Sequence, residues 1–125
     1  FLLGQYDKAD GVYARLIEQT DDNDRQWVYR FRRGQAAFFQ DDMKTAVERL
    51  KPVAALKQLD ERQELHRAAF LLGDAQLQRG ENDAAAQALQ RYLELTDGPR
   101  PEARLKLGLA QLRRGDEEQA RRAFA

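Results

Sequence analysis

Apolar residues recur every three or four positions along most of the chain. The clearest stretches are residues 27–38 and 103–112, where apolar or small side chains fall on one face of a helix. Polar segments at residues 21–24 and 96–99 separate such stretches and contain residues that cap helices or form turns. β-Branched residues are few and no stretch alternates cleanly, so strands are not expected. The pattern therefore predicts an all-α fold.

The same pattern predicts where each helix lies. We expect helices over about residues 7–20, 24–40, 43–57, 61–79, 82–96, 100–114 and 117–125. Pro52 lacks a backbone donor and crowds the carbonyl of Glu48, so the helix should kink there or end and restart. Pro101 suits the first turn of a helix.

Small and large residues repeat in a fixed register. Gly34, Gly73 and Gly108 each precede an alanine by 12 residues, and a large apolar residue follows each alanine four positions later. The four alanines lie 37, 39 and 35 residues apart and are followed by the large residues in the same order: Ala9, Ala46, Ala85 and Ala120, then Tyr13, Leu50, Leu89 and Phe124. This register predicts repeated helical hairpins. The units cover about residues 1–21 (partial), 24–58, 61–97 and 100–125 (partial), in a single domain spanning residues 1–125.

The order of residues in these units resembles the tetratricopeptide repeat. A leucine–glycine pair, an apolar residue, a turn glycine, an alanine and an aromatic residue follow one another as Leu107, Gly108, Leu112, Gly115, Ala120 and Phe124. The unit from Leu72 to Leu89 is similar. In the first complete unit Arg33 replaces the leucine and Asp41 replaces the turn glycine, so a distorted turn is expected. The resemblance implies an α-solenoid of about three and a half antiparallel helix pairs, wound as a right-handed superhelix.

Composition excludes several kinds of chemistry. The 125 residues contain 21 Lys and Arg against 21 Asp and Glu, which gives no electrostatic case for nucleic acid or an anionic membrane. No apolar run approaches the roughly 20 residues of a membrane span. The chain has no Cys and no Ser, which excludes their nucleophiles, disulfides and thiolate metal sites. His66 is the only histidine and is expected to be a partly exposed surface residue. We therefore expect no enzyme activity, cofactor or metal.

Two charged features have alternative interpretations. The acidic run at residues 21–24 suggests calcium, but Arg25 and Gln26 break the ligand pattern of a calcium loop, so helix capping is favoured. Arginines cluster at residues 30–33, 113–114 and 121–122. They could contact a polyanion, or be solvated and paired with nearby acids. Overall neutrality favours pairing, with these acids: Asp24, Glu48, Glu117 and Glu118.

The resemblance places a partner-binding surface on the concave face, formed by the first helix of each pair. In this chain that face carries Val28, Phe31, Gln35, Phe38, Arg67, Phe70, Asp74, Leu77, Glu102, Leu105, Leu109 and Leu112. Some tetratricopeptide domains hold a terminal carboxylate there with lysine and asparagine, and these residues cannot form that clamp. Phe31, Phe70 and Leu105 are predicted to form one exposed apolar stripe for an extended or helical segment. Packing within the solenoid is an equal alternative for Phe38, Leu77 and Leu112.

The expected function is that of a non-enzymatic scaffold binding a partner protein or peptide. The composition and uneven repeats resemble bacterial cell-envelope members of the family, including exopolysaccharide-export scaffolds, which favours the periplasm or envelope over the cytoplasm. The alternatives are a regulatory or substrate-recruiting module of a larger enzyme, and a polysaccharide-binding surface at Trp27, Tyr29 and the arginines. Phe1 and Phe124 fall inside incomplete helix pairs, so we expect a piece of a longer array that can associate end to end through uncapped repeats.

Overall fold

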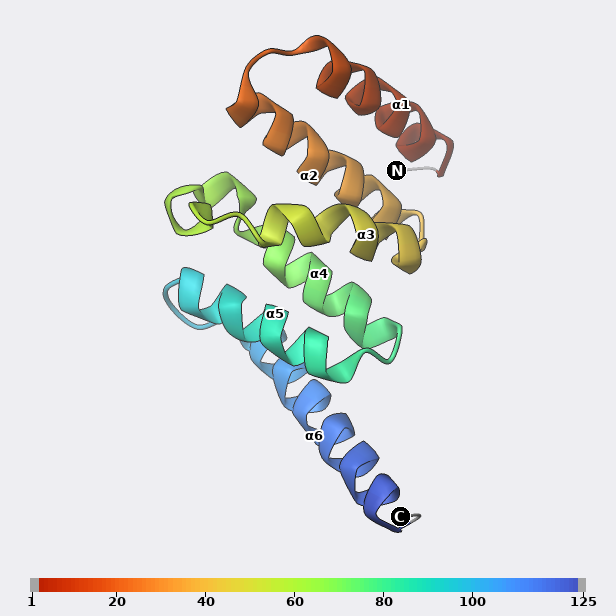
Figure 1. The fold of residues 1–125 in the computed structure, drawn as a ribbon, viewed down its shortest axis with the longest axis vertical. Coiled ribbons are helices and arrows are strands. Elements are labelled where there is room, and N and C mark those ends of the chain that lie inside the picture. Colours follow the sequence, from red (N-terminus) through yellow and green to blue (C-terminus); the bar gives the residue numbers. More distant parts are fainter. Residues whose placement is uncertain (1–2, 124–125) are drawn as a thin grey trace.

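The computed structural model describes residues 3–123, apart from the side chains of residues 3, 119, 120 and 123. These residues form six α-helices and two 3₁₀ turns, with no strand among them (Figure 1). The helices are α1 (Leu3–Gln19), α2 (Asn23–Phe39), α3 (Met43–Ala54), α4 (Arg67–Gln78), α5 (Asn82–Leu95) and α6 (Pro101–Ala123), and the 3₁₀ turns are η1 (Leu59–Glu61) and η2 (Gln63–Leu65). The predicted all-α class is confirmed.

The helices stack in chain order into an elongated array with the two ends far apart (Figure 1). Each helix packs on the next, and α2 also contacts α4, which in turn contacts α6. Direct contacts among α1, α3 and α5 are sparser. The first helices of the pairs therefore form the inner layer of an α-solenoid, and the second helices form the outer layer. Within the described residues, no helix has both the length and the apolar character that a membrane span requires.

Aspartates start two of the helices. Asp22 accepts hydrogen bonds through Oδ1 from the backbone N–H groups of Asp24 at 3.0 Å and Arg25 at 3.3 Å, and it caps α2. Asp42 caps α3 by accepting from the N–H of Thr45 at 3.2 Å. Helix N-termini leave backbone donors unpaired, and an aspartate oxygen satisfies them. The prediction that the acidic run at residues 21–24 caps a helix is thus confirmed.

The turn after α2 is not distorted, contrary to expectation. Asp41 has a φ of +63°, close to the +78° of Gly80 in the equivalent turn after α4. Each turn closes with the same hydrogen bond, from Asp42 N to Ala37 O at 3.0 Å and from Glu81 N to Gln76 O at 2.9 Å. Aspartate is one of the few residues other than glycine that visits this left-handed region. Asp41 therefore builds the same turn as the glycine it replaces.

Pro52 lies inside α3, which continues past it and ends at Ala54, three residues before the predicted end. The missing donor of Pro52 leaves the carbonyl of Glu48 without its helical partner, which weakens the last turn. The following residues form η1 and η2, where one long helix from residue 61 was expected. Leu59 and Leu65 in these turns are fully buried. The two leucines anchor the connection, and α4 begins only at Arg67.

His66, expected at the surface, is buried instead at the junction of η2 and α4. Its ring Nε2 lies 3.2 Å from the carbonyl oxygen of Asp60 in η1. The compact double turn brings that carbonyl within hydrogen-bond distance of the ring nitrogen. The burial of His66 therefore follows from the turn structure that the helical pattern did not predict.

The C-terminal segment also departs from the prediction. A turn was expected at Gly115, but α6 runs through it as one helix to Ala123. Gly115 does not adopt the positive φ seen at Gly80, and the residues after it are mainly charged, so they offer little apolar surface for folding back. Asn82 Nδ2 donates to Glu117 Oε1 at 2.8 Å, which ties this part of α6 to the start of α5. The predicted alanine–aromatic pair falls largely outside the described residues, because the side chain of Ala120 and all of Phe124 are not described.

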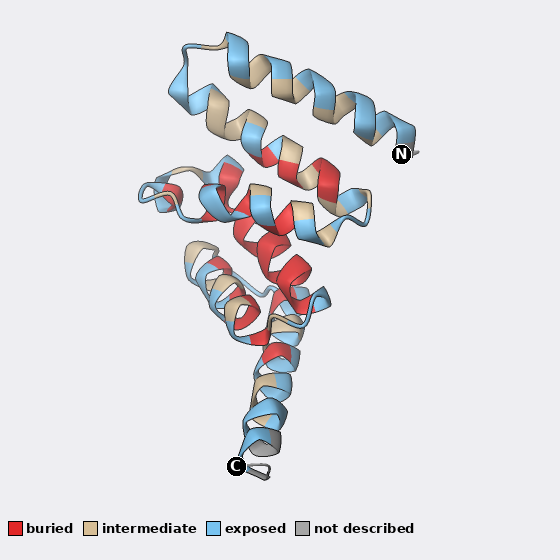
Figure 2. Ribbon diagram, turned by 45° about the vertical axis from the view of Figure 1, so that its right-hand side comes forward, coloured by how far each residue is buried: buried red, intermediate tan, exposed pale blue. Residues whose placement is uncertain are grey.

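The core is centred on α4, where residues 68–77 are all buried (Figure 2). A Cβ added to Gly73 would lie 2.6 Å from the side chain of Leu89, and one added to Gly34 would lie 2.7 Å from that of Leu50. Leu50, Leu89, Ala46 and Ala85 are fully buried. The predicted role of glycine and alanine in close helix packing is confirmed in these two pairs. Gly108 has no such neighbour among the described residues.

Asp10 joins the first three helices. Its Oδ1 lies 2.9 Å from Arg33 Nε on α2 and 2.7 Å from Arg49 Nη1 on α3. All three side chains are partly buried. Arg33 occupies the place where the other repeats have leucine, and Asp10 provides the counter-charge that makes arginine acceptable there.

Candidate partner-binding surface

A groove runs along the inner layer between α4 and α6. It encloses about 660 Å³. Its lining combines three leucines with five polar side chains: Leu77, Leu105, Leu109, Asp74, Gln78, Glu102, Lys106 and Arg113. The helical period places these residues on facing sides of the two helices. Five of the twelve predicted site residues thus come together here: Asp74, Leu77, Glu102, Leu105 and Leu109.

Asp74 is the polar centre of the groove floor. Its Oδ2 lies 3.0 Å from Lys106 Nζ, and its Oδ1 accepts a hydrogen bond from Gln78 Nε2 at 3.1 Å. Lys106 also lies 3.9 Å from Glu102, four residues earlier on α6. Both carboxylate oxygens of Asp74 are therefore engaged, and the pair holds α6 against α4. The groove is left with an apolar wall and a neutralised floor.

The apolar wall is formed by α6. Leu105 is 74% exposed, and Leu109 and Leu112 are also exposed. In α2 and α4 the residues equivalent to Leu105 are Phe31 and Phe70, and each is only 3% exposed. The Phe70 ring packs against Tyr92 of α5, with 5.3 Å between ring centres. The expectation of one exposed stripe through all three residues is therefore wrong, because Phe31 and Phe70 belong to the core.

The predicted residues on α2 lie apart from the α4–α6 groove. Val28 and Phe38 are half-buried against the core, and Phe38 meets Phe39 edge-on. Gln35 lines a separate cavity of about 530 Å³ between α1 and α2. Arg67 is exposed at the start of α4. Leu77 is buried, which agrees with the alternative that it packs within the solenoid, whereas Leu112 is exposed. The structure thus separates the α2 members of the set from the others.

Sequence reasoning did not identify Lys106, Gln78 or Arg113 as lining residues. Lys106 follows Glu102 by four positions, a spacing at which opposite charges meet on a helix, and that signal could have identified it. Gln78 and Arg113 carry no comparable signal, because their place in the groove depends on how α4 and α6 cross.

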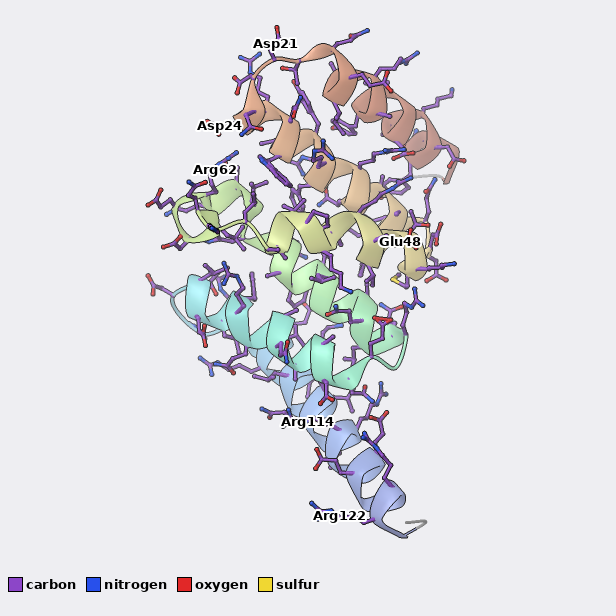
Figure 3. The ribbon with its side chains drawn as sticks, viewed as in Figure 1. Asp21, Asp24, Glu48, Arg62, Arg114 and Arg122 are labelled. Atoms are coloured by element: carbon purple, nitrogen blue, oxygen red, sulfur yellow. The ribbon has the colours of Figure 1, made fainter. Side chains whose placement is uncertain are left out.

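The arginines pair only in part as expected. Asp24 pairs with Arg62 across the start of α2, with 3.3 Å between Oδ1 and Nη1, and Figure 3 shows both side chains there. Arg114 lies 3.6 Å from Asp83, while Arg121 meets Glu117 at 4.0 Å as a pair of the expected kind. On α2, Arg30 lies over the Trp27 ring.

Perturbed carboxyl groups lie outside the groove. Hydrogen bonds from the Thr45 side chain and backbone lower the pKa of Asp42, the cap of α3. The hydrogen bond from Arg62 lowers the pKa of Glu64 in η2. Both shifts stabilise the charged form of an exposed carboxylate that supports local structure. In the described part of the chain, no cluster of three or more His, Cys, Asp or Glu side chains is arranged to hold a metal ion.

Comparison with known proteins agrees with this geometry. A family model described as Tetratricopeptide repeat matches residues 31–99 and, in a second register, residues 70–125. Neither a curated protein nor a solved structure matches the chain significantly. The two matched segments together cover well over half of the 125 residues, and they contain the glycine–leucine contacts and the left-handed residues Asp41, Gly80 and Gly98. The chain therefore belongs to the tetratricopeptide repeat family.

Proposed function

We propose that this chain is a non-enzymatic scaffold that binds a partner protein or peptide in the α4–α6 groove of its concave face. Repeats of this family generally mediate protein–protein interaction, and its members are typically scaffolds without catalytic activity. The groove provides a specific binding site for such a partner. It offers leucines as contacts and an internally satisfied polar floor that requires no charge from the partner.

The observation that carries this proposal is the exposure of Leu105, Leu109 and Leu112 on one side of α6. Exposed apolar rows that border a groove are typical of interaction sites. A partner segment with apolar side chains at helical or extended spacing would cover them.

Site-specific photo-crosslinking tests this assignment. A photoreactive residue replacing Leu109 should capture a partner from an extract of the source cell, whereas one replacing Glu48, exposed on the outer helix α3 (Figure 3), should not. With the captured partner purified, Leu105→Asp should weaken binding at least tenfold and leave the melting temperature nearly unchanged. Equal capture from both positions, or unchanged affinity in Leu105→Asp, would contradict the groove assignment.

We also propose end-to-end self-association as a second candidate, supported by the open space beside Gly108 of α6. Gly108 of α6 has open space where Gly34 and Gly73 hold a leucine, and Tyr13 of α1 lines the cavity between α1 and α2. Tyr13 is the repeat equivalent of those leucines, so α6 of one copy and α1 of another could form a helix pair. Sedimentation velocity should then show concentration-dependent oligomers that Gly108→Leu abolishes. A monomer at all concentrations would remove this candidate.

The narrower roles are further proposals. Composition and uneven repeat lengths support a place in a bacterial envelope or secretion assembly, such as exopolysaccharide export. A recruiting module of a larger enzyme is the alternative. A longer sequence with a signal peptide would favour the envelope role, and one with a catalytic motif would favour the enzyme-linked role. A polysaccharide surface has less support, because Trp27 and Tyr29 are half-buried and Tyr29 packs near Tyr13.

A further inference from the structure

A second hollow adjoins the α4–α6 groove towards the starts of both helices. It consists of two adjoining cavities of about 410 Å³ and 250 Å³ that share Arg67, Tyr92 and Arg100. Arg67 begins α4, Tyr92 lies near the end of α5, and Arg100 directly precedes α6. Glu102 lines both this hollow and the groove, so the two adjoin. We call the space around these three shared residues the arginine hollow.

The two arginines of the hollow are not engaged in ion pairs with described residues, whereas Arg33 and Arg49 share Asp10. The guanidinium of Arg67 is held over the Phe70 ring, 5.1 Å from its centre. The N-terminal ends of α4 and α6 add positive potential at the same place.

Acidic side chains do not cancel this charge. Asp97 and Glu102 line the hollow, but both are exposed, and Glu102 lies 3.9 Å from Lys106. The hollow thus has two arginines outside any ion pair among the described residues and two helix N-termini. They lie beside one exposed carboxylate and one that is 3.9 Å from a lysine.

Tyr92 supplies an unused donor. The residue is only 8% exposed, and its hydroxyl forms no hydrogen bond with the described residues. The sealed side-chain atoms without partners are Gln76 Oε1 and Asn82 Oδ1, so the Tyr92 hydroxyl is open to the hollow that the residue lines. An open hydroxyl without a protein partner is free to donate a hydrogen bond to a bound acceptor.

We propose that the arginine hollow binds a carboxylate of the partner segment, at a glutamate or aspartate next to the apolar residues that lie along α6. This inference rests on the proposed function, because the same segment occupies the groove. Guanidinium groups match the planar carboxylate, and the tyrosine hydroxyl completes its hydrogen bonds. The hollow lies at the starts of α4 and α6. It also fixes the direction of the segment, with its acidic end at the start of α6.

The test uses hexaglutamate as the probe and the complete chain labelled with ¹⁵N. Backbone amide signals at Arg67, Tyr92 and Arg100 should shift and saturate together. Arg67→Gln and Arg100→Gln should each raise the Kd at least fivefold. The matched control is Arg30→Gln, because Arg30 is also exposed, lies over an aromatic ring and has no ion pair with a described residue. It should change the Kd less than twofold.

Tyr92→Phe separates binding from folding. It keeps the ring that packs on Phe70 and removes only the unpaired hydroxyl, so it should raise the Kd about threefold without lowering the melting temperature. Equal losses in Arg67→Gln and Arg30→Gln, or no saturable shift at the hollow, would overturn the proposal. Tighter binding of inorganic phosphate than of hexaglutamate would also overturn it, and would indicate a phosphorylated partner.

The proposed function and this inference fail in different ways. If hexaglutamate occupies the hollow but no partner crosslinks at residue 109, the groove assignment is wrong and the anion site stands alone. If a partner crosslinks at residue 109 while Arg67→Gln and Arg100→Gln bind it normally, only the carboxylate contact is wrong.

Discussion

At the scale of single residues, glycine decides how closely the helices of a pair approach. In the α2–α3 and α4–α5 pairs a leucine side chain occupies the space beside a glycine Cα, at distances where a methyl group cannot fit. Both glycines lie within helices, where glycine is intrinsically less favourable than alanine. The packing gained across the pair outweighs that local cost.

A pair of glycine substitutions should therefore have opposite effects. Gly73→Ala should lower the free energy of unfolding by about 1–3 kcal/mol, because Leu89 must move. Gly108→Ala should raise it by up to about 1 kcal/mol, because nothing described lies near the added methyl group and alanine favours helix. Urea unfolding followed by circular dichroism measures both. Similar losses at the two sites would show that the contact with Leu89 does not explain the glycine.

Asp41 tests the cost of a left-handed residue. Asp41→Gly should stabilise the chain by about 0.5–1 kcal/mol, because glycine adopts a φ of +63° without strain. The converse change, Gly80→Asp, should destabilise it by a similar amount. Thermal melts of the two variants provide the measurement, and a destabilised Asp41→Gly would mean that the aspartate side chain supports the turn.

Phe70 should behave as a core residue and not as a binding residue. Phe70→Ala should cost about 3–5 kcal/mol of stability, because the ring is buried against Tyr92. Leu105→Ala, at the equivalent but exposed position of α6, should cost less than about 0.5 kcal/mol. A melting temperature for Phe70→Ala close to that of the unaltered chain would place the ring outside the core.

At the scale of elements, capping sets the start of α3 and makes it sensitive to pH. Hydrogen bonds from Thr45 favour charged Asp42 and lower its pKa. The stabilisation is present above the unfolded-state pKa of the carboxyl group and is lost as the pH falls through the lower folded-state pKa. Asp42→Ala should cost about 1 kcal/mol at pH 7. The difference in free energy of unfolding between Asp42→Ala and the unaltered chain should become smaller in acid. Chemical unfolding at a series of pH values measures this difference. A difference that stays constant into strong acid would show that charge is not involved.

The termini of helices also show where sequence patterns mislead. Gly80 and Gly115 occupy equivalent repeat positions, yet only Gly80 adopts a left-handed φ and ends a helix. The difference lies in the residues on the C-terminal side of each glycine. After Gly80 a buried helical face, with Ala85 and Leu89, folds back onto α4, whereas residues 116–118 are acidic and exposed. A turn residue permits a turn, and the apolar surface beyond it supplies the driving force.

At the scale of the whole molecule, Asp10 connects α1 to the rest of the stack. Stacked aromatic rings of Tyr6 and Phe39, 5.7 Å apart, add a second contact. Asp10→Ala should leave Arg33 and Arg49 without this partner and cost about 1 kcal/mol, because the pairs are only partly buried. Hydrogen exchange should accelerate across α1 more than across α4. The matched control is Glu18→Ala, which removes an exposed acid from the same helix. Uniform acceleration over all helices would contradict a local role.

The sequence by itself determined the helical class, the register of the repeats, the cap of α2 and the turn at Gly80. These depend on residues close together in the chain: helical periodicity places one face inward, and Asp22 and Gly80 satisfy or release the backbone where helices begin and end. For the same reason the roles of Gly34 and Gly73 could be predicted from their fixed distance to the following leucine.

Only the tertiary structure decided which face of each inner helix is open. Phe31, Phe70 and Leu105 are equivalent in the sequence, yet two are covered by neighbouring elements and one is exposed. Asp74 forms an ion pair with Lys106, and Asp10 forms ion pairs with two arginines, in each case across a long separation in the sequence. Burial and ion pairing depend on what lies opposite a residue in the stack, and a local pattern does not contain that information.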